Sequence, residues 1–289
     1  MLLDCQTTLA APVSFHGCGL HSGLDCQVRI LPAPADHRIR FVRTDLVEAP
    51  EIPADIDAVS TEPMLRQTVL CSPDDPAVMV ETVEHILASL HGMGIDNARV
   101  EMSGSEPPIG DGSARELAEL LLAAGVTPLA GAPRRTFAIT RPVVFSTNGG
   151  TRVEFSAWPS EKLTLTYFME YDHPVIGSKV VSFEIEPEAF ASQIAPARTF
   201  CLFQEVEYLR EKGLIKGGSA DNAIVVGDTG ILNTELLWED EMARHKLLDL
   251  LGDLFLLGLP VRGHIQAWRS GHSANAEFIQ FLRKEFTQA

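Results

Sequence analysis

A chain of 289 residues is long enough for one large or two ordinary domains, and its composition of 45% hydrophobic and 21% charged residues is that of a globular protein. The net charge of −16 at pH 7 excludes a general nucleic-acid binder, which needs a basic surface. No apolar run approaches the roughly 18–20 residues of a membrane-spanning helix. Because the chain is acidic overall, any anionic substrate must be bound by local basic side chains.

The five cysteines are scattered, odd in number and without a C-x-x-C pair. This pattern argues against a disulfide framework and against a cysteine-rich zinc knuckle, and it favours a reducing, cytoplasmic location. A metal in this chain would therefore be held by histidine and carboxylate side chains.

The first half of the chain is expected to open with alternating strands, joined by the Gly-rich turn Gly17–Gly23, and to close with helix, strand and helix. Glu81 or Thr82 can cap the first of these helices. The expected elements span Thr7–Phe15, Asp25–Leu31, Val83–Met93, Asn97–Met102 and Ser113–Ala124.

The Gly- and Pro-containing segment Leu129–Pro133 predicts a boundary between a first domain over residues 1–130 and a second over residues 134–289. The second half again runs from a hairpin, turning at Asn148-Gly149-Gly150, to helix, strand and helix. Both halves thus predict an α+β fold of two pseudo-repeated two-layer sandwich domains, each a β-sheet packed with helices. The expected elements of the second half span Phe137–Phe145, Thr151–Ala157, Leu163–Tyr171, Glu239–Leu257, Arg262–Trp268 and Ser273–Phe286.

An insertion over Ile194–Val226 interrupts the second half. It combines an expected helix over Leu202–Lys212, a Gly-rich loop over Gly213–Ser219 and a strand over Ala223–Val226. Two interpretations stay open: a small satellite core, or a hydrophobic groove for a lipid or an apolar partner. Both rest on its apolar side chains, which are Leu202, Phe203, Val206, Leu209, Leu214 and Ile215.

The expected helix Glu239–Leu257 carries one imidazole and two carboxylates on a single face. At about 100° per residue, Asp249 lies about 40° around the helix from His245, and Asp253 about 80°. Such groups are costly to bury unless they are paired or bind a metal. The alternative is a core histidine whose only role is to bond to Asp249.

Glu84 and His85 open the first long helix of the first half, and His245 lies in the equivalent helix of the second. If the two halves pack as pseudo-symmetric partners, both histidines meet at the interface between the domains. Two histidines and Asp249 then form a three-ligand metal site with an open position, which is typical of catalytic zinc. The alternative for Glu84 is an acidic first turn favoured by the helix dipole.

His272 follows the last expected strand, in Ser270-Gly271-His272. Side chains at a strand–helix junction project into clefts, and Asp253 could orient this imidazole and raise its pKa. The other histidines are interpreted as structural; they are His16, His21, His37, His91, His173 and His264.

These motifs together resemble the zinc-dependent UDP-3-O-acyl-N-acetylglucosamine deacetylases of bacterial lipid A biosynthesis. They follow the order of that family from about residue 7 to residue 286. The matching segments are Gly17-Cys18-Gly19-Leu20-His21-Ser22-Gly23, Thr82-Val83-Glu84-His85, Gly94-Ile95-Asp96-Asn97, Asp111-Gly112-Ser113-Ala114, Ala197-Arg198-Thr199-Phe200, Gly217-Gly218-Ser219, Arg244-His245-Lys246 through Asp249 to Gly252-Asp253, and Ser270-Gly271-His272.

The resemblance implies a role for each matching polar residue. Glu84 matches the general base, and His272 matches the general acid or cationic stabiliser that Asp253 orients. Thr199 matches the hydroxyl that helps to hold the developing oxyanion. The implied zinc ligands are His85, His245 and Asp249.

The resemblance also implies contacts with substrate. Lys246 matches a substrate-binding lysine, Phe200 a ring near the sugar, and the insertion a passage for a fatty acyl chain. Two positions depart from the family: Cys201 stands where a small residue is common, and Arg269 where lysine is frequent. The expected substrate-binding set is Lys246, Phe200, Leu202, Phe203, Val206, Ile215 and Arg269.

The implied reaction removes the N-acetyl group of UDP-3-O-(3-hydroxyacyl)-N-acetylglucosamine as acetate, the committed step of lipid A biosynthesis. The implied cofactor is Zn²⁺, although Fe²⁺ suits the same ligands. We expect a monomer without nucleic-acid partners that contacts a membrane peripherally. Two alternatives stay open: a different metallohydrolase built on the same ligands, and a non-catalytic protein with structural zinc.

Overall fold

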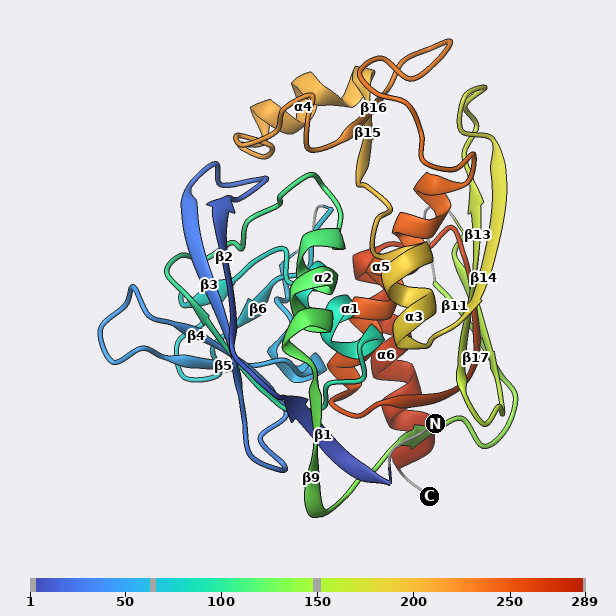
Figure 1. The fold of residues 1–289 in the computed structure, drawn as a ribbon. Helices are drawn as coiled ribbons and strands as arrows, with labels where there is room; N and C mark the ends of the chain where they lie inside the picture. Colours follow the sequence, from blue (N-terminus) through green and yellow to red (C-terminus); the bar gives the residue numbers. More distant parts are fainter. Residues whose placement is uncertain (1–3, 63–65, 148–151, 288–289) are drawn as a thin grey trace.

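Two β-sheets lie on opposite sides of the molecule, and the longer helices α1, α2, α5 and α6 lie between them (Figure 1). This computed structural model describes residues 4–62, 66–147 and 152–287. The segment that carries α4, β15 and β16 lies at one end of the molecule, at the top of Figure 1.

The first half forms an open sheet of strand order β2-β3-β8-β4-β5, in which β4 and β8 run parallel and the other neighbours antiparallel. A short helical turn, η1 (Ile56–Ala58), follows β5 in the chain. The elements of the first half are β1 (Cys5–Leu9), β2 (Val13–Cys18), β3 (Asp25–Pro32), β4 (Ile39–Arg43), β5 (Glu51–Pro53), β6 (Leu70–Cys71), β7 (Met79–Val80), α1 (Glu84–Gly92), β8 (Ala98–Met102), α2 (Arg115–Ala124) and β9 (Val126–Pro133).

The second half forms a sheet of order β11-β12-β17-β13-β14, with β10 also pairing with β17. Its elements are β10 (Phe137–Ala138), β11 (Val143–Ser146), β12 (Glu154–Trp158), β13 (Leu163–Glu170), β14 (Ser178–Glu184), α3 (Pro187–Ala189), η2 (Phe190–Ile194), β15 (Phe200–Leu202), η3 (Phe203–Glu205), α4 (Val206–Glu211), β16 (Ile224–Val226), α5 (Glu241–Leu254), η4 (Phe255–Leu257), β17 (Val261–Trp268) and α6 (His272–Thr287).

The two sheets repeat one topology. Strands β2, β3, β8, β4 and β5 correspond in order and direction to β11, β12, β17, β13 and β14, and the parallel pair in each is the same one. The helix–strand–helix ending recurs as α1-β8-α2 and α5-β17-α6. The predicted α+β fold with a repeated sheet-and-helix layout is confirmed.

Each sheet buries one face against the helices between the two sheets. Along β17, buried and half-buried side chains alternate over the whole strand, with Ile265 and Ala267 fully buried. This period of two is what a strand with one covered face requires. On the same side, Phe155 of β12 stacks on Phe278 of α6, with ring centroids 4.3 Å apart.

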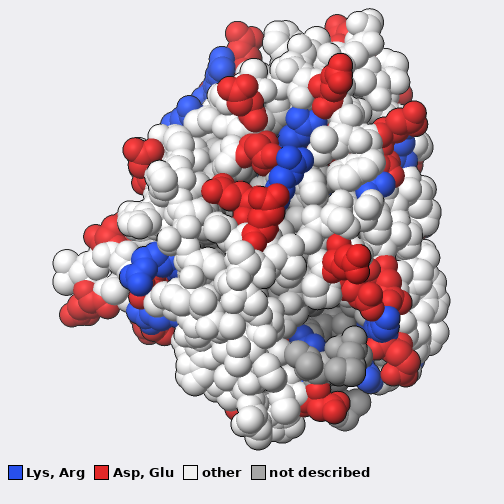
Figure 2. Space-filling model, in the orientation of Figure 1, with Lys and Arg blue, Asp and Glu red and all other residues white. Residues whose placement is uncertain are grey.

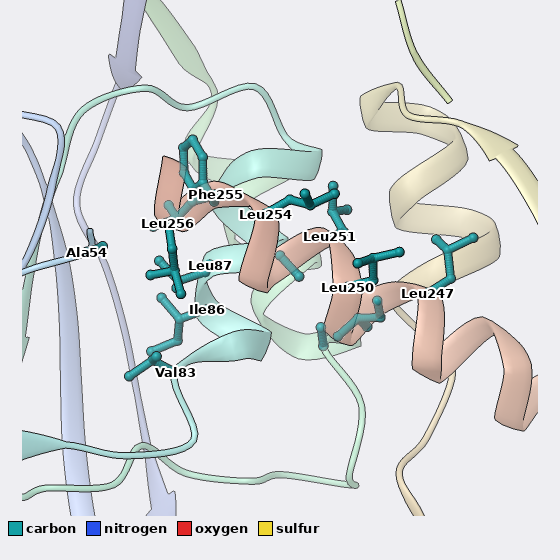
Figure 3. Packing of buried hydrophobic residues seen from close by; sticks show 14 of the residues in the cluster. Ala54, Val83, Ile86, Leu87, Leu247, Leu250, Leu251, Leu254, Phe255 and Leu256 are labelled. Atoms are coloured by element: carbon teal, nitrogen blue, oxygen red, sulfur yellow. The ribbon is translucent and has the colours of Figure 1, made fainter. Parts of the chain in front are cut away.

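The equivalent helices α1 and α5 pack directly against each other. Figure 3 shows Ile86 and Leu87 of α1 turned towards Leu256 of η4, the turn that directly follows α5, with Ala54 of the first half on the same side. Glycine at position 252 permits the close approach, because a Cβ atom there would overlap the carbonyl group of Glu84. This contact fixes α5, which carries one histidine, against the start of α1, which carries the other.

We predict that Gly252→Ala destabilises the fold by about 1–3 kcal/mol, because the added methyl group must push α1 and α5 apart. Denaturant unfolding measures this loss. Gly230→Ala is the matched control, since a Cβ at Gly230 meets no atom within 4 Å. Wild-type stability in Gly252→Ala would contradict the close helix contact.

Two expectations about strands are wrong. The run Thr7–Phe15 is split: β1 pairs with β9, whereas β2 joins the first sheet, with Pro12 between them. The run Phe137–Phe145 is also split, because β10 and β11 pair with different strands. In both cases the hydrophobic alternation continues while the pairing partner changes. The segment Leu129–Pro133 belongs to strand β9, which was not predicted.

Other elements differ in smaller ways. Strands β4, β5 and β14 were not predicted, and the expected helix Leu202–Lys212 is shortened to α4 by β15 and a 3₁₀ turn. Thr82 does not cap α1: its φ is 54° and its hydroxyl donates to Glu106 (2.9 Å). The predicted turn Asn148-Gly149-Gly150 lies outside the described residues. The division into domains near residue 130 stays a prediction.

Acidic side chains are spread over the face shown in Figure 2, and basic side chains lie next to them. On that face the acidic side chains form several groups and are not gathered in one area. None of the helices in the described part of the chain combines the length and apolar composition needed to cross a bilayer.

Candidate active site

His85, His245 and Asp249 meet where α1 packs on α5. The Nε2 atom of His245 lies 3.5 Å from Asp249 Oδ1, and that of His85 lies 3.9 Å from the same oxygen. One ligand atom from each of the three residues lies within 4.8 Å of the others. Ligand atoms around a tetrahedral zinc ion are roughly 3.3 Å apart, so this donor set needs little movement to hold one.

The protonation of these groups also suits a divalent metal. Burial lowers the pKa of His85 to about 3 and also lowers the pKa of His245, so both imidazoles are neutral at pH 7. Burial acts to raise the pKa of Asp249, but Lys246 and His245 outweigh it and hold that pKa well below its usual range. Neutral imidazoles and an ionised carboxylate are the forms that bind metal.

Two hydrogen bonds orient the donors. The Nδ1 atom of His245 lies 3.0 Å from the carbonyl oxygen of Ala197, which leaves Nε2 for the site. Lys246 donates to Asp249 Oδ2 (2.8 Å) and leaves Oδ1 towards the histidines. Partners behind metal ligands fix their orientation in this way, so the donor set fits a metal.

Glu84 is buried beside the donor set. The backbone N–H of Thr68 donates to its Oε2 (3.0 Å), and its Oε1 lies 3.8 Å from His272 Nε2. Burial raises the pKa of Glu84 to about 7, against the influence of the His272 cation. A carboxyl group with a pKa near neutrality can take up and release a proton, as a general base must.

His272 faces Glu84 from the first turn of α6. Its Nδ1 atom lies 3.0 Å from Asp253 Oδ2, so the predicted contact between these residues is present. Burial opposes the charged form, but the carboxylates of Asp253 and Glu84 outweigh it and raise the pKa of His272 to about 9. The imidazole is therefore a cation at neutral pH, and its Nε2 lies 3.9 Å from Asp249 Oδ2.

The donor set lines a cavity of about 580 Å³, a size that suits a small-molecule site. The insertion supplies much of its apolar wall. Leu202 differs from expectation, since it packs against the hydrophobic core and does not line the cavity. The apolar residues that line it from the insertion include Phe203, Val206, Leu209, Ile215 and Val225.

Thr199 and Phe200 enter the cavity on a segment tied down from both sides. The N–H of Thr199 donates to Gly112 O (2.8 Å), and its carbonyl accepts from Ile224 N (2.8 Å). The preceding residue, Arg198, forms an ion pair with the fully buried Glu241 (2.8 Å). These bonds hold the Thr199 hydroxyl in the wall of the cavity, where Lys246 and Arg269 also lie.

Several residues in or next to the cavity wall carried no sequence signal. Thr68 bonds to Asp253 and Glu84 from a segment without a motif, and Arg66 and Tyr171 line the cavity. His21, interpreted as structural, is also in the wall, and its Nε2 has no hydrogen-bond partner among the described residues. The Gly17–Gly23 motif was the one signal that could have pointed to His21.

An α+β fold whose repeated halves meet at a buried His2Asp donor set, flanked by a carboxylate and an imidazolium, defines a metal-dependent hydrolase. The family model described as "LpxC: UDP-3-O-acyl N-acetylglycosamine deacetylase" matches residues 6–284. The chain belongs to this family of deacetylases.

Individual relatives agree with the family match. The chain is 41% identical over 280 residues to a UDP-3-O-acyl-N-acetylglucosamine deacetylase of Trichormus variabilis, covering 95% of this chain and 97% of the relative. It is 40% identical over 283 residues to one of Pseudomonas entomophila, covering 97% and 90%. It is also 41% identical to a bifunctional enzyme LpxC/FabZ of Chlorobaculum tepidum; the match covers 98% of this chain but 65% of that longer protein.

Proposed function

We propose that this protein hydrolyses the N-acetyl group of a UDP-linked 3-O-acyl-N-acetylglucosamine and releases acetate, in lipid A biosynthesis. The observation that carries the proposal is the position of the donor set. His85, His245 and Asp249 line a largely apolar cavity, with Glu84 and His272 beside them. The names of the relatives supply the substrate.

The proposed cofactor is one Zn²⁺ held by His85, His245 and Asp249, and Fe²⁺ suits the same ligands. When bound, the metal supplies Lewis acidity, which polarises a carbonyl oxygen and makes water a better nucleophile. No cysteine or fourth protein group joins these three in the donor cluster of the described residues, as expected for a catalytic site with an open position.

The side chains of the chain itself handle the protons. Glu84 takes a proton from the attacking water, since its buried carboxyl group has a pKa near neutrality. The His272 cation faces Glu84 across the site and gives a proton to the departing amine. The Thr199 hydroxyl donates a hydrogen bond to the oxyanion that develops on the amide, and Asp253 holds His272.

The rest of the cavity is proposed to bind the substrate. Phe203, Val206 and Ile215 cover the acyl chain, and Phe200 lies near the sugar. Lys246 and Arg269 supply the local cations that an acidic protein needs to hold a diphosphate. Arginine and lysine differ in geometry, so Arg269 contacts phosphate through a planar fork.

The surroundings of the site suggest how the protein works in the cell. Phe203 lines the cavity and is 60% exposed, which supports peripheral contact with the membrane that holds lipidic substrates. The protein is proposed to act as a monomer. The five cysteines are free thiols, which supports a cytoplasmic location.

We predict that the purified protein binds about one metal ion per chain and loses its deacetylase activity with a chelator, because three ligands leave one metal site. Metal analysis and acetate release from UDP-3-O-acyl-N-acetylglucosamine measure the two quantities together. Activity should return with Zn²⁺. Full activity in the metal-free protein would contradict the proposal.

A second arm of this experiment separates the competing function, a metallohydrolase with the same ligands but another substrate. Under our proposal, acetate release falls sharply when the substrate lacks the acyl chain or the UDP group. Equal turnover of such truncated substrates would favour a general amidase and would leave the apolar cavity without a role.

A further inference from the structure

Thr68 touches both proposed proton-transfer groups of the site. It lies just before β6, and its side chain is fully buried, with a relative exposure of 1%. Its hydroxyl donates to Asp253 Oδ1 (2.6 Å) and lies 3.0 Å from His272 Nδ1. Its backbone N–H donates to Glu84 Oε2 (3.0 Å).

The hydrogen bonds around Asp253 show which atom donates in the contact between Thr68 and His272. The hydroxyl of Thr68 has one proton, and the short contact to Asp253 Oδ1 takes it. Towards His272 the hydroxyl oxygen can therefore act only as an acceptor. Nδ1 of His272 must then carry the hydrogen, which it shares between Thr68 and Asp253 Oδ2 (3.0 Å).

The same network fixes the carboxylate that orients His272. Asp253 Oδ1 accepts from Thr68, and Asp253 Oδ2 accepts from His272 and from Asn275 (2.7 Å). Without the Thr68 hydroxyl, Oδ1 loses the one donor that the described residues give it, and the carboxylate is held through Oδ2 alone. A fixed carboxylate holds the Nδ1–H of His272 and so keeps its Nε2 turned towards Glu84.

On the other side, Thr68 selects the working oxygen of Glu84. Its N–H holds Oε2, so Oε1 is the atom that faces His272 Nε2 (3.8 Å). The backbone of Thr68 is itself held, because its carbonyl oxygen accepts a hydrogen bond from the N–H of Val83, just before α1 (3.5 Å). Thr68 thus ties the acid from the second half of the chain to the base from the first.

We infer that Thr68 is a positioning residue for the deacetylation proposed above: its hydroxyl fixes the Asp253–His272 pair, and its N–H fixes Glu84. Thr68 touches no reacting atom and acts through these side chains. The inference rests on the proposed function for its kinetic consequence, but the geometry that it describes exists without substrate.

The test replaces Thr68 by valine, which has nearly the same shape but no hydroxyl, and by serine, which keeps the hydroxyl. Thr68→Val should lower kcat about 10–100-fold with KM changed by less than about twofold and metal content unchanged. Thr68→Ser should restore most of kcat. Wild-type kcat in Thr68→Val, or a loss that serine does not restore, would overturn the inference.

Thr8→Val is the matched control for the loss of a buried threonine hydroxyl. Thr8 is also buried, donates to Asn97 O (2.8 Å) and accepts from Ala33 N (2.9 Å), away from the cavity. The Thr8→Val variant should have a changed melting temperature and an unaltered kcat. A fall in kcat as large as that of Thr68→Val would show that general destabilisation explains both.

Two further measurements separate this inference from the proposed function. In a His272→Gln background, Thr68→Val should cause no further loss of kcat, because the two changes disable one unit. Independently of substrate, ¹⁵N NMR should show the ring-nitrogen resonances of His272 moving in Thr68→Val and not in Thr8→Val. If the wild type failed to deacetylate, the proposed function would fall, and unmoved resonances alone would overturn the role of Thr68.

Discussion

Glu84→Gln is expected to lower kcat by about 10²–10⁴-fold, the usual contribution of a general base, while the metal content stays near one per chain. Glutamine has the shape of glutamate, and its amide oxygen can still accept from the N–H of Thr68. It cannot accept a proton from water at neutral pH. Stopped assays of acetate release, with metal analysis of the same samples, measure both quantities.

The metal content gives this experiment its discriminating power. If Glu84 were itself a ligand, the variant would lose metal along with activity, and its role as a base would be wrong. Glu116→Gln is the control, since Glu116 occupies the first turn of α2 and is exposed. Its kcat should match that of the wild type.

The second large effect is expected for His272→Gln, which should also lose about 10²–10⁴ in kcat because no cation remains to protonate the leaving amine. In the wild type, the pKa of His272 is about 9, above that of an ordinary histidine, so the imidazole keeps its proton through neutral pH. On the alkaline side, the wild-type kcat should therefore fall as the pH rises through about 9. The variant should lack this alkaline fall.

The acid side of the same profile reports on Glu84. Its raised pKa of about 7 means that the carboxylate form is lost as the pH falls through that value, so wild-type kcat declines there. Glu84→Gln should lose the acid limb and keep the alkaline one. His264→Gln, which changes a half-buried histidine bonded to Thr166 (2.9 Å), is the control and should keep both limbs. An alkaline limb that survives in His272→Gln would contradict the assignment.

The repeat was the part of the fold most open to prediction. Helices α1 and α5 were predicted from their apolar periodicity; His85 lies in α1 and His245 lies in α5. Because equivalent helices of the two halves pack together, the pattern also predicted that His85 and His245 would meet. In the structure, the two histidines do meet, in the donor cluster that they form with Asp249.

Strand boundaries were predicted less well, and for one physical reason. Local alternation indicates that a segment is extended, but the choice of partner depends on sheets that form far away in sequence. The run from Thr7 to Phe15 keeps its alternation through Pro12, yet its two parts belong to different sheets. Segment Leu129–Pro133 resembled a linker by composition and became a strand because β1 lies beside it.

By itself, the sequence determined the class of fold, the helices that carry the ligands and the chemical nature of the donors, since these depend on periodicity and residue type. Three features are visible only in the tertiary structure. They are the position of the Thr68 hydroxyl between Asp253 and His272, the place of His21 in the cavity wall and the close helix contact at Gly252. These features join residues far apart in the chain, and hydrogen bonds and steric fit act over a few ångströms of space whatever the separation in sequence.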